Sequence, residues 1–124
     1  MDADRQNILL VDDEDIIIDV TGQMLKQFGY AVFIARSGPE AIDLYQEHHD
    51  KIDLVILDMV MPGMSGGDTY DRLQAIDPDI KVILSSGYGL NDETSAILDR
   101  GCSGFIQKPF DLNGLAQKIR DVLD

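Results

Sequence analysis

The chain has 124 residues, enough for one domain with its own hydrophobic core, residues 1–124, and too few for a second domain of ordinary size. Hydrophobic residues make up 44% and charged residues 27% of the chain, which excludes a disordered protein. The 10 Lys and Arg against 23 Asp and Glu give a net charge of −13. That charge argues against direct binding of DNA or RNA, whose phosphates require an excess of basic side chains.

Five short apolar runs along the chain are predicted to be buried β-strands. They consist mostly of Ile, Val and Leu without polar alternation, which is typical of strands covered on both faces of a parallel sheet. In chain order these runs are residues 8–11, 31–35, 54–57, 82–84 and 104–106.

The segments between these runs carry helical periodicity. In the first, Ile17, Val20, Met24 and Phe28 share one face of a helix, which is predicted to be the buried face. Gly29 follows directly and is placed to end this helix in a left-handed conformation, which glycine adopts readily.

The second and third predicted helices have recognisable starts, whereas the fourth has a weaker pattern. Ser37 with Glu40 predicts a capping box at the start of the second helix, and Ser65 with Asp68 repeats the arrangement at the third. The fourth helix, residues 91–99, is short and has the weakest apolar face.

The fifth helix has the clearest pattern and is predicted to start behind an N-cap at Asp111. Its apolar residues recur at helical spacing: Leu112, Leu115, Ala116, Ile119, Val122 and Leu123. Strands and helices therefore alternate as (βα)5, which predicts an α/β fold with an open, doubly wound, five-stranded parallel sheet. The flavodoxin-like strand order 2-1-3-4-5 is the commoner one for five strands.

Cysteine content and hydropathy bear on where the protein works. Cys102 is the single cysteine, so an intramolecular disulfide is excluded and a reducing compartment is favoured. Residues 1–5 are polar, unlike a secretory signal, and no apolar run approaches the ~20 residues that span a bilayer. We expect a cytoplasmic protein without a membrane segment.

Polar side chains follow four of the predicted strands at the point where each strand ends. Asp12 and Asp13 end the first strand, Asp58 the third, Ser86 the fourth and Lys108 the fifth. Ligands of open α/β sheets bind beyond the carboxyl ends of the strands. The sequence therefore predicts that three carboxylates, a hydroxyl and an amine meet in one crevice.

This combination favours phosphoryl chemistry with a metal ion. Three neighbouring carboxylates repel one another, so one would hold a proton unless a cation neutralised them. Mg²⁺ is the natural cation, because it prefers carboxylate oxygens and reaches toward phosphates. An ionised Asp58 can then attack phosphorus and form an acyl phosphate. Lys108 and Ser86 are suited to bind oxygens of the transferring group.

Each of these residues taken alone has a simpler interpretation. Asp13 fits a helix cap and Asp58 fits a turn residue before Pro62, each at about even odds. Ser86 alone is typical of a loop, and a lysine such as Lys108 is by default a solvated surface amine. The four sites coinciding at strand ends is what favours a functional site.

Four segments resemble the signature segments of the response-regulator receiver domain. They are residues 11–14 (VDDE), 57–63 (LDMVMPG), 85–87 (SSG) and 105–110 (FIQKPF). The resemblance covers essentially the whole chain, in the family's order and separations, and is specific when the segments are taken together.

The resemblance implies a role for each matching residue. Asp58 matches the phosphoacceptor, while Asp12 and Asp13 match the acidic pair that holds Mg²⁺ with Asp58 and the backbone carbonyl of Val60. Ser86 and Lys108 match the residues that contact the phosphoryl group. A cis peptide bond is implied between Lys108 and Pro109.

The resemblance also implies how such a protein switches. Ser86 turns toward the phosphoryl group and Phe105, at the aromatic switch position, fills the vacated space; Phe lacks the hydroxyl of the Tyr common there. The surface of the fourth helix, fifth strand and fifth helix then changes and is a site for homodimer formation. Val60 and Tyr88 flank the acceptor and are expected to slow hydrolysis of the acyl phosphate.

The expected partners are a histidine kinase or a histidine phosphotransfer protein, and the chain is an enzyme only toward its own phosphorylation and dephosphorylation. Residues 104–110 resemble receivers at the C-terminus of hybrid sensor kinases; a single-domain regulator is the alternative. Two competitors remain: a receiver that binds partners without phosphorylation, and an enzyme on the same scaffold. For the latter, Asp13 and Asp15 loosely match the Asp pair of haloacid-dehalogenase-type phosphatases, whereas a flavodoxin would lack its phosphate loop here.

Overall fold

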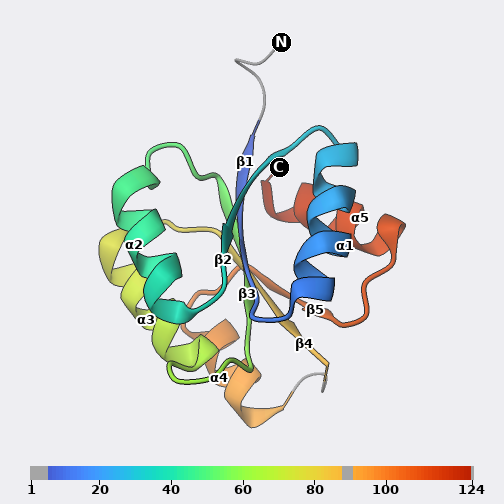
Figure 1. Cartoon of the computed structure of the whole chain (residues 1–124). Helices are drawn as coiled ribbons and strands as arrows, with labels where there is room; N and C mark the ends of the chain where they lie inside the picture. Colours follow the sequence, from blue (N-terminus) through green and yellow to red (C-terminus); the bar gives the residue numbers. More distant parts are fainter. Residues whose placement is uncertain (1–5, 88–90, 124) are drawn as a thin grey trace.

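A five-stranded parallel sheet forms the centre of the computed structural model, which describes residues 6–87 and 91–123. The strand order is β2-β1-β3-β4-β5, as predicted (Figure 1). The strands are β1 (Asn7–Val11), β2 (Ala31–Ala35), β3 (Leu54–Asp58), β4 (Val82–Ser86) and β5 (Gly104–Gln107). Three of them extend further toward their carboxyl ends than predicted, so Asp58 and Ser86 are the last residues of strands and not loop residues.

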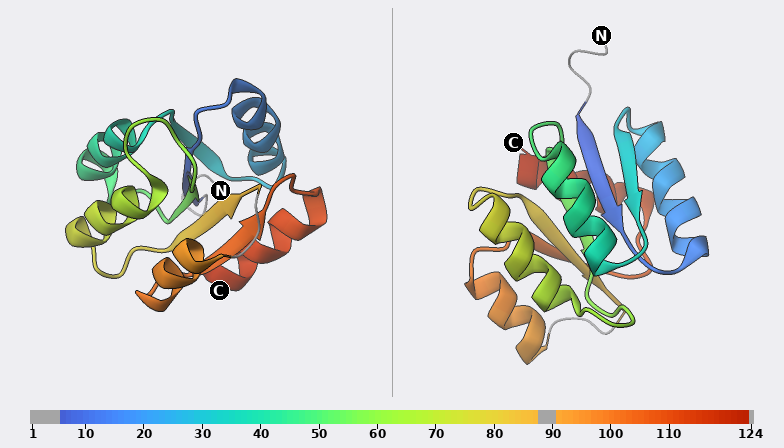
Figure 2. Two further views of the ribbon diagram at one scale, coloured as in Figure 1. Left: turned by 90° about the horizontal axis from the view of Figure 1, so that it is seen from below. Right: turned by 60° about the vertical axis from the view of Figure 1, so that its left-hand side comes forward.

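Five helices cover the two faces of the sheet. They are α1 (Asp15–Gln27), α2 (Gly38–His48), α3 (Gly66–Ile76), α4 (Asp92–Asp99) and α5 (Leu112–Leu123). Helices α1 and α5 lie on one face and α2, α3 and α4 on the other (Figures 1 and 2). Within the described residues, none of these helices combines the length and apolar character needed to cross a bilayer.

The sheet separates two layers of hydrophobic core. Along β3, Val55 and Leu57 pack toward α2, α3 and α4, whereas Leu54 and Ile56 pack toward α1 and α5. All four side chains are at most 1% exposed, and each contributes about 1.5–3 kcal/mol by leaving water. Burial on both faces explains why the strands lack polar alternation.

The buried face of α1 differs from the predicted one. Val20 is 48% exposed, and Met24 and Phe28 are only partly buried. The residues of α1 that are fully buried are Ile18, Thr21, Gly22 and Leu25. The prediction was partly right, because Met24 and Phe28 pack against the core layer on the α1 and α5 side of the sheet. It missed the centre of the buried face, because α1 has a second, adjacent apolar stripe that the small residues at 21 and 22 allow to lie against the sheet. Gly29 ends the helix with φ +96°, as predicted.

The predicted serine caps are present at the starts of α2 and α3, but neither forms the complete capping box that was predicted. The Ser37 and Ser65 hydroxyls accept hydrogen bonds from the amides of Glu40 (3.2 Å) and Asp68 (3.1 Å). The Glu40 carboxylate, however, accepts from the amide of Arg36 and does not complete the box with Ser37. The caps fix where α2 and α3 begin, and α3 starts beside the end of β3.

The starts of the last two helices are also capped by side chains. Asp111 caps α5 by accepting from the amide of Gly114 at 2.7 Å, as predicted. A reciprocal capping box between Asn91 and Thr94, which was not predicted, starts the short helix α4.

Candidate functional site

The predicted site residues meet at the carboxyl edge of the sheet, which is the lower end in Figure 1 and faces the viewer in the left view of Figure 2. Asp12 and Asp13 follow β1, Asp58 ends β3, Ser86 ends β4 and Lys108 follows β5. Because these strands are parallel neighbours, their last residues lie side by side.

Backbone hydrogen bonds continue just beyond the strands and hold this edge in place. The amide of Lys108 donates to the carbonyl of Ser86 at 2.8 Å, and the amide of Met59 donates to Ser85 at 2.9 Å. The amide of Asp12 donates to Ala35 at 3.1 Å. Strand β3, which carries Asp58, and its neighbours are therefore fixed relative to one another by the sheet itself.

Three carboxylates converge at this edge. One oxygen each of Asp12, Asp13 and Asp58 lies within 4.8 Å of the others. Asp12 and Asp58 are 1% and 3% exposed, whereas Asp13 is half-buried. A cluster of hard oxygen ligands of this kind fits Mg²⁺, which takes one or two carboxylates and completes its shell with water.

Lys108 supplies the positive charge among these acids. Its ammonium nitrogen lies 2.7 Å from Oδ2 of Asp12 and 3.3 Å from Oδ1 of Asp58, and its side chain is 12% exposed. The two carboxylates also accept hydrogen bonds from the backbone: the amide of Glu14 donates to Asp12, and the amide of Val60 donates to Asp58. Lys108 is thus a largely enclosed partner of two acids and not a solvated surface amine.

Burial and neighbouring charges change the pKa values of Asp58 and Lys108. Loss of water, together with the nearby Asp12 carboxylate, raises the pKa of Asp58 to about 6 from an ordinary 3.8, although Lys108 acts in the opposite direction. Burial by itself would lower the pKa of Lys108, but its hydrogen bond to Asp12 and the charge of Asp58 raise it. An additional cation at this edge would favour the ionised form of Asp58.

A cavity of about 490 Å³ opens over the acids. Its lining consists of Asp13, Glu14, Asp58, Val60, Gly87 and Lys108. Asp12 and Ser86 do not line the cavity; they are buried at its edge, and Val60 is 58% exposed. Glu14 was not predicted as a site residue, although the acidic run of residues 12–15 was the signal that could have indicated it.

The two predicted switch residues share one face of the sheet. Phe105 pairs in register with Leu84 and packs against the core layer that contains it. Side chains two positions apart on a strand point the same way, so Ser86 faces the same side as Leu84. Tyr88, also predicted to flank the acceptor, lies outside the described residues.

Two further expectations can be compared directly with the geometry. The N-cap position of α1 is Glu14, without a side-chain cap bond, so capping does not explain Asp13. The peptide bond between Lys108 and Pro109 is cis, as the resemblance implied.

Two curated proteins are similar in sequence to this chain over most of its length. Sensor kinase CckA of Brucella abortus is 36% identical over 94% of this chain, which spans 12% of the kinase. Sporulation initiation phosphotransferase F of Bacillus subtilis is 32% identical over 96% of this chain, which spans 94% of that protein.

Solved structures share the fold. The CheX-CheY-BeF3-Mg²⁺ complex from Borrelia burgdorferi superposes with a TM-score of 0.93 and 30% identity, covering 99% of this chain and 93% of that chain. A response regulator receiver domain protein from Clostridium thermocellum gives a TM-score of 0.90 and 30% identity, covering 95% of this chain and 94% of that chain. Residues 8–120 match the family described as the response regulator receiver domain. The chain therefore belongs to this family, the phosphorylation-dependent switches of two-component systems.

Proposed function

We propose that Asp58 accepts a phosphoryl group from a phosphohistidine of a histidine kinase or a histidine phosphotransfer protein. The observation that carries the proposal is a buried carboxylate that faces an open cavity and has two acids and a lysine beside it. A carboxylate oxygen of Asp58 forms the bond to phosphorus while the phosphorus–nitrogen bond breaks, and the electron pair stays on the imidazole.

Mg²⁺ is the proposed cofactor. Asp12, Asp13, Asp58 and the backbone carbonyl of Val60 would hold it, and the convergence of the three carboxylates supports this set. Bound there, it supplies positive charge that offsets the negative charge of the phosphoryl group. Glu14, which lines the same cavity, is placed to influence that charge balance without being assigned a ligand role.

Lys108 and Ser86 are the proposed contacts of the phosphoryl oxygens. The Lys108 ammonium, now 3.3 Å from Asp58, is close enough to bind an oxygen of a group attached there. Ser86 ends the neighbouring strand and offers a hydroxyl. With these groups the chain promotes its own phosphorylation and dephosphorylation and acts on no separate substrate.

The output surface is proposed to comprise α4, β5 and α5. Phosphorylation adds roughly −1.5 to −2 charges and three acceptor oxygens at Asp58. Ser86 and Phe105, which face the same side of the sheet, would move together to transmit this change to α4 and β5. A changed α4-β5-α5 surface would then bind the downstream target or a second copy of the chain.

The phosphodonor is proposed to dock beside the site on α1. The α1 residues Ile17, Val20 and Met24, with Pro109 and Phe110, line an apolar cavity of about 210 Å³ that also reaches Lys108. An apolar surface continuous with the acceptor site suits a helix that carries a phosphohistidine. Because these phosphodonors act in the cytoplasm, we propose that the protein works there too. Val20→Asp should leave labelling by acetyl phosphate unchanged and reduce labelling by a phosphorylated histidine kinase.

Intact-mass measurement after incubation with acetyl phosphate and Mg²⁺ tests the proposal. Mass is the suitable readout because the chain contains no Trp. We expect one added phosphoryl group that requires Mg²⁺ and is missing in Asp58→Ala. Because a short-lived adduct could escape detection, the same samples are treated with beryllofluoride and examined by amide NMR. Absence of both responses would point instead to a binding module that works without phosphorylation. Hydrolysis of an added phosphate ester would favour the phosphatase alternative.

A further inference from the structure

Gly66, the first residue of α3, lies directly against the backbone at the end of β3. Residues 58–60, which begin with the proposed acceptor Asp58, are called the acceptor segment below. A Cβ atom at this position would be 2.7 Å from the Cα of Met59 and 2.8 Å from the carbonyl oxygen of Asp58. Both are backbone atoms, so they cannot turn away as the tip of a side chain can. Only the absence of a side chain at residue 66 allows α3 to approach the end of β3 this closely.

The close contact also closes the loop between β3 and α3. The amide of Gly66 donates to the carbonyl of Met59 at 3.2 Å, so the loop returns to the residue that follows the acceptor. Met59 and Met61 are buried at 5% and 8% exposure, while Val60 between them faces the cavity. The position of Val60 is therefore set by two buried neighbours and by the contact at Gly66.

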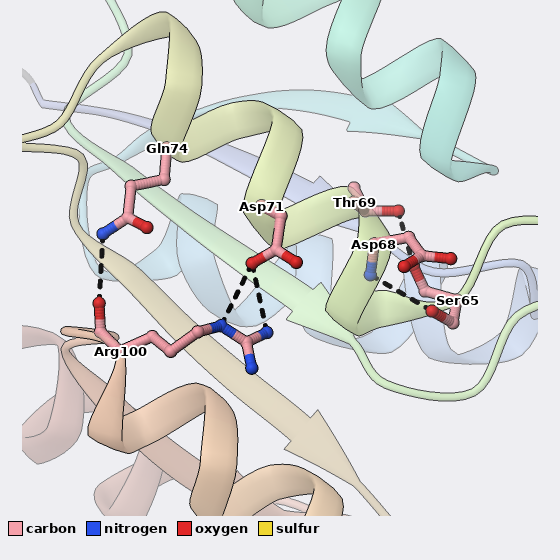
Figure 3. A network of polar contacts seen from close by, with 6 residues as sticks. All are labelled: Ser65, Asp68, Thr69, Asp71, Gln74 and Arg100. Atoms are coloured by element: carbon pink, nitrogen blue, oxygen red, sulfur yellow. Dashed lines mark hydrogen bonds and ion pairs between the residues drawn. The ribbon is translucent and has the colours of Figure 1, made fainter.

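Helix α2 opposes movement of α3 from the other side. A Cβ at Gly38 would lie 3.0 Å from Cβ of Met64, and the hydroxyl of Thr69 would stand in its way. That hydroxyl donates to the carbonyl of Ser65 at 2.8 Å, within the capped first turn of α3 (Figure 3). Because α2 is packed this closely, α3 has little room to retreat from the acceptor segment.

We propose that Gly66 is a positioning residue for the Mg²⁺ and phosphoryl site, because its bare Cα holds the Asp58–Val60 backbone in the geometry that both need. The inference rests on the proposed function. A side chain at residue 66 displaces the backbone of Asp58 and Met59, and with it the Asp58 carboxylate and the Val60 carbonyl. The carboxylates of Asp12 and Asp13 stay where β1 places them, so the ligand set no longer matches one ion.

A purely structural role for Gly66 makes a different prediction. If the residue served only the packing of α3, Gly66→Ala would lower the melting temperature and leave the Mg²⁺ affinity of the folded protein unchanged. Gly67→Ala is the matched control, because it adds the same methyl group one residue later. Its Cβ would meet side-chain atoms alone, the end of Ile97 at 3.4 Å and the Ser65 hydroxyl at 3.9 Å, which are ordinary contacts.

The experiment titrates MgCl₂ into wild type, Gly66→Ala and Gly67→Ala by calorimetry, well below each melting temperature. Displaced ligand positioning typically costs 10–100-fold in metal affinity, so we expect Gly66→Ala to weaken Mg²⁺ binding by about ten-fold or more. Gly67→Ala should bind like wild type. A folded Gly66→Ala with the affinity of Gly67→Ala overturns the inference. A wild-type protein that binds no Mg²⁺ overturns the proposed function instead.

Gly38→Ala decides the matter if Gly66→Ala does not fold. Its methyl group would meet atoms of the Met64 and Thr69 side chains and no backbone atom, so this variant is expected to fold with a small shift of α3. It presses on the first turn of α3 from α2, and we expect a weaker but measurable loss of Mg²⁺ affinity. Unchanged affinity in Gly38→Ala, with Gly66→Ala unfolded, would assign both glycines to packing alone.

Discussion

Each end of the central sheet gathers three aspartates, but the two groups are arranged differently. At the carboxyl end, Asp12, Asp13 and Asp58 bring ligand oxygens within 4.8 Å of one another, and within the described ranges this is the single acidic group so arranged. At the amino end, the loops before β3 and β4 place three more around a polar cavity of about 220 Å³. These are Asp53, Asp77 and Asp79.

The two groups differ in how their oxygens are satisfied. At the amino end, Asp53 accepts from the amide of Asn7 at 2.8 Å, and Asp77 accepts from the amide of Asp79 and the hydroxyl of Tyr45. Asp53 and Asp77 are thus held by local donors, and all three acids are partly or fully exposed. At the carboxyl end, two buried acids share one lysine. We infer that neighbouring aspartates suit a metal ion where burial makes them share one cation, as at the carboxyl end. Where local donors hold exposed aspartates, as at the amino end, they serve the structure of the loops.

The largest effect should come from removing one acid of the carboxyl end. Asp12→Asn removes the charge of a buried group that we propose as a Mg²⁺ ligand. We expect Mg²⁺ affinity to fall by about 100-fold, since even the partners of metal ligands are worth 10–100-fold. Asp77→Asn, the same change at the amino end, should bind Mg²⁺ like wild type. Calorimetric titration measures both. Equal losses in the two variants would break the distinction between the two ends.

The second effect concerns stability and pH. The pKa of Asp58 is raised to about 6 in the folded chain from 3.8, so its proton is held more tightly in the folded state. The stability associated with that proton is fully present below pH 3.8 and is lost as pH rises through about 6. Without Mg²⁺, Asp58→Asn should therefore increase the free energy of unfolding by about 2–3 kcal/mol at pH 7.5.

Urea unfolding at pH 7.5 and pH 5 checks this sign. The gain from Asp58→Asn should be smaller at pH 5, where the wild-type carboxyl is already mostly protonated, and smaller again when Mg²⁺ is present. Asp77→Asn is the control at the amino end, because its carboxylate has local donors. A gain that grew on acidification would contradict the assignment of the buried charge to Asp58.

The third effect is a stability loss confined to the amino end. Tyr45 is 2% exposed, and its hydroxyl donates to Oδ2 of Asp77 at 3.1 Å. Tyr45→Phe removes that hydrogen bond while keeping the ring in the core, so we expect a loss of about 1 kcal/mol in the free energy of unfolding. Mg²⁺ affinity should not change. A change in both would mean that the two ends of the sheet are coupled.

The sequence was informative where a residue type and its place on a strand decide the outcome. Asp12, Asp58 and Lys108 could be placed together because parallel strands put their carboxyl ends at one edge. The buried face of α1 could be predicted only in part, since its two adjacent apolar stripes differ only in what packs against them. The close approach at Gly66 was equally hidden, because a glycine at the start of a helix carries no sign of the backbone that lies against it.

The smallest effect is expected at an acid that has a cation partner but no burial. Asp71 on α3 and Arg100 at the end of α4 are 53% and 43% exposed (Figure 3). Two guanidinium nitrogens of Arg100 lie 3.1 Å from one oxygen of Asp71. Water and salt screen this pair, so Arg100→Gln should cost about 0.5 kcal/mol or less, measured by urea unfolding at low salt, and nothing at high salt.

Lys108→Gln is the matched change at a buried pair, and it should behave differently in the same assay. It leaves two buried carboxylates without their cation, and the response to salt should be weak because buried charges are poorly screened. If Arg100→Gln lowered the free energy of unfolding equally at low and high salt, the Asp71–Arg100 pair would be more enclosed than its exposure indicates. A cation partner would then stabilise an aspartate even at an exposed position. Burial could no longer explain why the aspartates at the two ends of the sheet differ.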